Sequence, residues 1–109
     1  MAWRRLSPAE APLARWLHGM AHDSVRGRTY LFGGWDGTLT TILPDMWAWD
    51  GRTWLRLFPT PIPSPRRGPA MAFDTARGRT LLYGGMGAKS LGDTWEWDGQ
   101  TWTRMTPAA

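Results

Sequence analysis

Residues 45–56 read Asp-Met-Trp-Ala-Trp-Asp-Gly-Arg-Thr-Trp-Leu-Arg, and residues 93–104 read Asp-Thr-Trp-Glu-Trp-Asp-Gly-Gln-Thr-Trp-Thr-Arg. The same pattern of Asp, Trp, Gly and Thr therefore occurs twice. A second pattern, Asp-x-x-Arg-Gly-Arg-Thr followed by Gly-Gly, begins at Asp23 and again at Asp74. Both copies hold the two patterns in the same order, so the chain is an internal repeat with a period of about 50 residues.

Each repeat predicts four short strands, because runs of apolar and β-favouring residues alternate with Gly-containing turns. The expected strands of the first repeat are 18–23, 28–32, 45–49 and 53–57, and those of the second are 69–74, 79–83, 93–97 and 101–105. A period of this length made of four strands is typical of a β-propeller blade. Two blades do not close a ring. We therefore expect an all-β fold of two four-stranded antiparallel blades, an incomplete propeller on its own.

The Asp50-Gly51 dipeptide predicts a two-residue hairpin turn between the third and fourth strands of a blade. Such a turn places Trp47 opposite Trp54 and Asp45 opposite Arg56. The second repeat has the equivalent pairs, Trp95 with Trp102 and Asp93 with Arg104. Trp side chains bury roughly 150–250 Å² each, and a lone sheet would leave them in water. We interpret the nine tryptophans as packing residues between blades rather than as a ligand site.

The glycine doublets, Gly33-Gly34 and Gly84-Gly85, each follow a predicted strand. Glycine at such a place indicates a positive φ or a close backbone approach. A phosphate loop is excluded, because the GxxxxGK[ST] spacing is missing and no helix pattern follows.

These residues resemble the kelch repeat, in which a strand ends in Gly-Gly and is followed by an aromatic residue and a Trp that are separated by six residues. Trp47 with Trp54, and Trp95 with Trp102, keep that spacing, with Trp where the family more often has Tyr. The resemblance implies blades with the first strand innermost and the fourth outermost. It also implies six or seven blades in a complete ring, from which this chain departs.

The repeats divide the chain into three parts. Residues 15–57 form the first kelch-type blade, and residues 58–109 hold an inter-blade loop and the second blade. Residues 1–14 are expected to be a partial blade, since Trp3, Arg5 and Leu6 match Trp54, Arg56 and Leu57 of the fourth strand. This spare strand favours a truncated member of a larger family, although a strand that completes another blade is also open.

Candidate binding residues lie in the loops that emerge on one side of both blades, since loops on a rigid scaffold tend to carry function. The loop 35–44 is the least repetitive, and its candidates are Trp35, Asp36, Thr38 and Thr40. A tolerated insertion is the competing interpretation. Arg15, Arg66 and Arg67 precede the innermost strands, where several guanidinium groups would bind carboxylate or phosphate. By resemblance, some kelch proteins bind acidic peptides in this way; arginines that bind backbone carbonyls at a blade junction are the equal alternative.

Catalysis is poorly supported, and we predict no catalytic residue, metal site or cofactor. His18 and His22 are four residues apart in a predicted strand, which separates them by about 13 Å, too far to share a metal. There is no Cys, and no Ser-His-Asp or HExxH pattern. The net charge of +4 suggests nucleic acid, but dispersed arginines argue against it. No apolar run has the ~20 residues of a membrane span and no signal peptide is visible, so cytoplasmic is the default expectation.

Three functions remain open. The first is a non-enzymatic kelch-type interaction module that binds a protein or peptide on its loop face and is completed by self-association, with a trimer of six blades favoured over a tetramer. The second is a piece of a larger kelch-like propeller enzyme or receptor with no activity of its own. The third is a small basic nucleic-acid binder.

Overall fold

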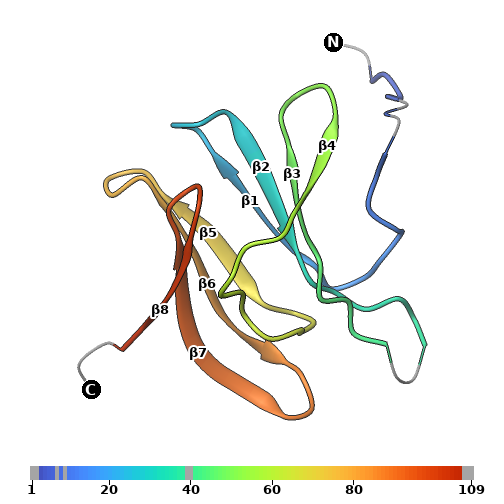
Figure 1. Cartoon of the computed structure of the whole chain (residues 1–109). Coiled ribbons are helices and arrows are strands. Elements are labelled where there is room, and N and C mark those ends of the chain that lie inside the picture. Colours follow the sequence, from blue (N-terminus) through green and yellow to red (C-terminus); the bar gives the residue numbers. More distant parts are fainter. Residues whose placement is uncertain (1–2, 7, 9, 39–40, 107–109) are drawn as a thin grey trace.

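The computed structural model describes residues 3–6, 8, 10–38 and 41–106, which form two four-stranded antiparallel sheets (Figure 1). The strands of blade 1 are β1 (Gly19–Asp23), β2 (Arg28–Phe32), β3 (Met46–Trp49) and β4 (Trp54–Leu57). Those of blade 2 are β5 (Ala70–Asp74), β6 (Arg79–Met86), β7 (Ser90–Trp97) and β8 (Trp102–Met105). In each sheet the strands follow one another in chain order, so the predicted all-β fold of two incomplete-propeller blades is confirmed.

The strands lie where the repeat predicts them, but β6 and β7 are longer than expected. Their ladder continues past the glycine doublet to the pair Met86–Ser90, with an irregularity between Tyr83 and Gly85. In blade 1 the equivalent connection has three more residues, and there Trp35 instead forms isolated bridges with Trp16 and Ile42. The extra residues thus interrupt the ladder that in blade 2 continues to the end of the hairpin.

The predicted two-residue turn at Asp50-Gly51 is wrong, because Asp50 through Thr53 form a four-residue connection. Trp49 pairs with Trp54, and Trp47 with Arg56. The cause is the Asp50 side chain, whose Oδ1 accepts hydrogen bonds of 2.9 Å from the amides of Arg52 and Thr53. This side-chain capping of a turn is typical of Asp. Blade 2 has the same turn, with Trp97 opposite Trp102 and Asp98 in the capping role.

Each blade has two faces of different composition. We call Trp face the side that carries the cross-strand Trp pair, Trp49 with Trp54 in blade 1 and Trp97 with Trp102 in blade 2. The opposite face of blade 1 carries Tyr30, Phe32, Met46 and Ala48. The equivalent opposite face of blade 2 carries Leu81, Tyr83, Thr94 and Glu96.

The core lies where the Trp face of blade 2 packs on the opposite face of blade 1. Trp97 meets Tyr30 edge to face at 5.7 Å between ring centroids, and Trp102 meets Phe32 in the same way at 6.0 Å. Trp102 also directs its Nε1 at the Met46 sulfur, 3.3 Å away. These side chains are buried, and β1 lies beside β5 at the inner edge of the two sheets (Figure 1). For this pair, the interpretation of tryptophan as inter-blade packing is confirmed.

The Trp face of blade 1 has no blade against it in the described part of the chain. A hollow of about 430 Å³ lies over Trp49, Trp54 and Met20, and residues of the N-terminal segment, Arg4 and Leu6 among them, form its other side. Residues 3–6 form no strand, and Trp3 is fully exposed. The physical reason is that a fourth strand needs a third strand beside it, and none of the described strands pairs with this segment.

The asymmetry between the two Trp faces can be tested with equivalent substitutions. We expect Trp102→Ala to lower the free energy of unfolding by about 3–5 kcal/mol, because it removes a fully buried ring from the core. Trp54→Ala, at the same repeat position on the uncovered face, is expected to cost less than half as much. Urea denaturation at low protein concentration measures both. Equal losses would contradict the packing described here.

Candidate binding face

The loop face is the side of the blades where the segments before β1 and β5 meet the β2–β3 and β6–β7 connections. In blade 1, Trp16 and Trp35 exchange two backbone hydrogen bonds of 2.9 Å. In blade 2, Arg67 and Met86 do the same at 2.9 and 2.8 Å. The two blades are then tied together, because Gly34 donates to the carbonyl of Arg66 and Gly68 to that of Leu17. The loop face is therefore a hydrogen-bonded extension of the sheets.

The glycine doublets make this close approach possible. A Cβ on Gly33 would lie 2.5 Å from the carbonyl oxygen of Arg66, and one on Gly85 would lie 2.9 Å from that of Arg67. Both glycines also have a positive φ, 67° and 104°. Their role is steric and conformational, as the sequence predicts.

Arg15 and Arg66 lie beneath the loop face, each in a two-bond ion pair with an aspartate. Arg15 donates to both carboxylate oxygens of Asp45 at 2.7 and 2.9 Å, and Arg66 to those of Asp93 at 2.6 and 2.9 Å. Each guanidinium also donates to the carbonyl of the first glycine of its doublet, at 3.1 Å. The Arg15 side chain is 2% exposed and that of Arg66 is fully buried. These arginines thus bind the blade itself, which was the alternative to ligand binding.

The aspartates of these pairs are held in the ionised form. Arg66 holds the pKa of Asp93 far below its usual range, and a hydrogen bond from Trp95 adds to this against the effect of burial. Burial raises the pKa of Asp45, but hydrogen bonds from Arg15 and Trp47 outweigh it and the pKa is lowered. Because these pKa values are depressed by folding, the pairs stabilise the fold above about pH 4 and lose this contribution as the pH falls. The predicted pairing of Asp45 with Arg56 is wrong, since Arg15 takes that place.

Arg67 is different from its neighbour, because its side chain is half-exposed and lies on the loop face. Its guanidinium carbon is 5.2 Å from the centroid of the Trp35 ring, a cation–π contact. Trp35 in turn meets Trp16 edge to face at 6.3 Å. Among the described residues no carboxylate pairs with Arg67. Of the three predicted arginines, this is the one that a ligand can reach.

The remaining candidates of the loop 35–44 lie beside Trp35. Asp36 accepts hydrogen bonds from the amide and hydroxyl of Thr38 at 2.9 and 2.8 Å, and these lower the pKa of Asp36. The indole of Trp35 donates to the carbonyl of Thr38. Thr40 lies outside the described residues. The structure therefore brings Trp35, Asp36, Thr38 and Arg67 together, and leaves Arg15 and Arg66 below them.

Sequence reasoning missed three apolar residues of this face. Trp16 and Leu17 are 66% and 54% exposed, and Met86 is 38% exposed. Trp16 occupies the repeat position of Arg67, and Trp35 that of Met86. A comparison of the repeats could have found the first of them, because a position that holds Trp in one repeat and Arg in the other needs no particular side chain for the blade itself.

His22 lies on β1, where its Nδ1 is 2.9 Å from the Thr29 hydroxyl. Within the described residues no group of three or more His, Cys, Asp or Glu side chains could hold a metal ion. The same residues include no helix that is long and apolar enough to cross a membrane.

Comparison with known proteins agrees with the blade geometry. Residues 17–57 match the family model of the kelch motif. Blade 1 is a kelch repeat. The matched residues contain the strands β1 to β4, and blade 2 repeats their order and their residue pattern. A kelch motif indicates a protein-interaction module. No curated protein matches the chain.

The different roles of two neighbouring arginines give a test. We expect Arg66→Ala to lower the free energy of unfolding by about 3–5 kcal/mol, because it leaves the Asp93 carboxylate buried without its partner. Arg67→Ala is expected to change it by less than about 1 kcal/mol, since it removes only a partly exposed cation–π contact. Thermal or urea denaturation measures both, and a larger loss for Arg67→Ala would contradict the assignment.

Proposed function

We propose that the chain is a non-enzymatic interaction module whose loop face binds a protein segment. The observation that carries the proposal is the half-exposed guanidinium of Arg67, stacked on Trp35 and without a carboxylate partner among the described residues. A guanidinium held by an aromatic ring loses little freedom when it binds a carboxylate with two parallel hydrogen bonds. The chemistry favours an acidic group on the ligand.

The apolar residues around Arg67 define the rest of the ligand. Trp16, Leu17 and Met86 expose apolar surface next to it, and Trp35 forms the centre of the group. Aromatic and arginine side chains in such a cluster are the residues that contribute most to protein interfaces. We therefore infer a peptide segment in which Asp or Glu stands beside an aromatic or aliphatic residue.

The second part of the proposal is self-association. In the described part of the chain no blade packs on the Trp face of blade 1, over which Arg4 and Leu6 lie, or on the opposite face of blade 2. The junction inside the chain joins faces of these two kinds. Exposed Met20 and Tyr83, one on each face, are 44% and 56% accessible. Apolar area of this kind favours association at roughly 25 cal/mol per Å². A second copy can supply the missing neighbour.

A nucleic-acid ligand is less well supported by the placement of the basic residues. Arg15, Arg26, Arg66, Arg77 and Arg79 are each engaged with a carboxylate of the chain. A phosphate group would have to displace these carboxylates to bind the same side chains. Binding that weakens steeply with salt would reinstate this function.

Peptide selection tests the loop face. A displayed library of random 12-residue peptides, selected on the chain, is expected to yield sequences with Asp or Glu next to an aromatic or aliphatic residue. A synthetic peptide from that set should bind the Arg67→Ala and Trp35→Ala variants at least ~10-fold more weakly, the scale of one charge-assisted hydrogen bond. Calorimetry measures this. The matched control is Arg104→Ala, which removes an exposed arginine of β8. Equal binding by the Arg67 and Arg104 variants would overturn the loop-face proposal.

The solution mass tests self-association. Light scattering behind size exclusion is expected to show a mass that rises with concentration towards three chains, a six-bladed particle. A single chain at every concentration would sink this part of the proposal, and polydisperse aggregate would favour the view that the chain is a piece of a larger propeller. Neither result depends on the peptide experiment.

A further inference from the structure

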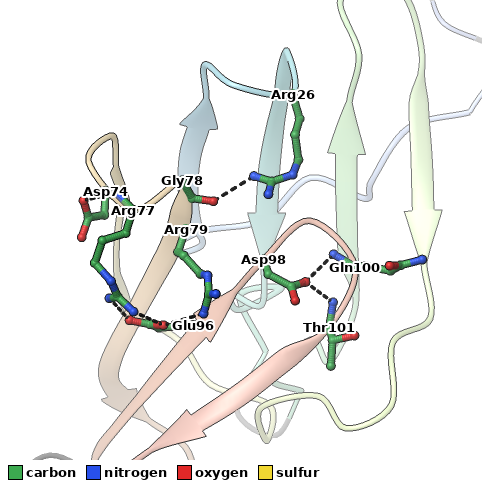
Figure 2. A network of polar contacts seen from close by, with 9 residues as sticks. All are labelled: Arg26, Asp74, Arg77, Gly78, Arg79, Glu96, Asp98, Gln100 and Thr101. Carbon is green, nitrogen blue, oxygen red and sulfur yellow. Dashed lines mark hydrogen bonds and ion pairs between the residues drawn. The ribbon is translucent and has the colours of Figure 1, made fainter.

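The junction between the two blades is fastened by an arginine that crosses it. Arg26, in the turn between β1 and β2, donates to the Asp23 carboxylate at 2.8 Å and to the carbonyl of Gly78 in blade 2 at 2.9 Å. It also lies against the β7–β8 turn, where a Cβ on Gly99 would overlap the Arg26 Nε. Figure 2 shows this guanidinium reaching across to Gly78. We call Arg26 the clasp of the junction.

Blade 2 has the same arginine, but it is turned back onto its own sheet. Arg77 occupies the repeat position of Arg26, in the turn between β5 and β6. Its two terminal nitrogens donate to the two carboxylate oxygens of Glu96 on β7, and Arg79 adds a longer contact of 3.4 Å. Both guanidinium groups converge on Glu96 in Figure 2. Arg77 is therefore a clasp that is held in place by a carboxylate.

Glu96 differs from the equivalent residue of blade 1. It lies on the opposite face of blade 2, where a further blade would pack. The equivalent residue of blade 1 is Ala48, which is buried at the junction between the blades. The Glu96 side chain is only 4% exposed, because the two arginines cover it. Arg77 holds the pKa of Glu96 below its usual range, so the carboxylate is ionised at neutral pH.

Blade 1 has the turns that an arginine clasp would contact, but the clasp positions beside them are empty in the described part of the chain. In blade 1, Gly27 and Gly51 occupy the repeat positions of Gly78 and Gly99. Gly99 is in contact with the Arg26 clasp, whereas no described residue comes within 4 Å of a Cβ built on Gly27 or on Gly51. One chain thus carries an arginine, Arg77, that crosses to no further blade. It also carries two turns, at Gly27 and Gly51, that no arginine of another blade contacts.

We propose that Arg77 transfers from Glu96 to the Gly27 carbonyl of a second copy, whose blade 1 docks its Trp face on blade 2. This transfer rests on the self-association proposed above, and it specifies which ion pair controls that association. Glu96 competes with the incoming copy for Arg77, because a carboxylate is a stronger acceptor for guanidinium than a carbonyl. After transfer, Arg79 remains as the partner of the buried carboxylate.

The contact between copies is weaker than the junction inside the chain. Besides Glu96, blade 2 has Ala70 at the position of Gly19, where a Cβ in the internal junction would lie 2.5 Å from the Met71 sulfur. The second copy presents the flexible side chain of Met20 at the place of Met71, so the contact can adjust. The expected association is therefore reversible and depends on concentration.

The test breaks the Arg77–Glu96 ion pair in two ways, by replacing the carboxylate or by replacing the guanidinium. Glu96→Ala frees the clasp and restores the residue of blade 1, and we expect it to tighten self-association by about 10-fold. Arg77→Ala removes the clasp, and we expect it to weaken self-association by a similar factor. Arg104→Ala is the control, since it removes an exposed arginine of β8 that lies outside this ion pair. Sedimentation equilibrium over a range of concentrations measures all four proteins, and circular dichroism checks that each is folded.

Opposite shifts for the two variants support the clasp, because a purely structural ion pair would give shifts of the same sign. Association of the native chain with equal or same-sign shifts overturns the clasp and leaves self-association standing. Single chains at all concentrations, for the native protein and for Glu96→Ala alike, overturn self-association and the clasp together.

Discussion

A four-stranded blade of this sequence has apolar side chains on both of its faces, and inside the chain the neighbouring blade covers one of them. The rest of the structure follows from this constraint. The packing of Trp97 and Trp102 against Tyr30 and Phe32 supplies the core that neither sheet holds alone. It also places β1 beside β5, and so brings the loops of both blades to one surface. The candidate binding face exists because the blades are packed in this way.

Beneath that surface, the buried arginines and aspartates bind each other and the backbone rather than a ligand. The Arg66–Asp93 pair links the segment before β5 to the middle of β7. The same guanidinium donates a hydrogen bond to the Gly84 carbonyl. Blade 1 repeats the arrangement with Arg15 and Asp45. A charge buried in such a pair makes the loop geometry specific, since every alternative would leave an ion without a partner. The partly exposed arginine, Arg67, is then positioned by a framework that does not depend on it.

The repeat predicts the fold well because its signals are local. The span of β2 agrees with the sequence at both ends, and the other strands of blade 1 differ by one residue at their start. The predicted length of the turn at Asp50 is wrong, because that length depends on side-chain hydrogen bonds that the dipeptide Asp-Gly does not reveal. Among the candidate site residues, Arg66 and Arg67 look equivalent in the sequence. Their burial is decided by which of the two points towards Asp93, and that follows only from the packing of distant segments.

The junction between the blades is directional, since it joins a Trp face to a face of the other kind. Contacts of this heterologous type cannot relate two copies by a twofold axis, because each copy would have to offer the same surface to the other. Copies joined through this junction must be arranged either as a closed cycle with rotational symmetry or as an open filament. The rotation from blade 1 to blade 2 decides between these outcomes. The alternation of two unlike faces along one chain therefore limits the symmetry of any assembly built on it.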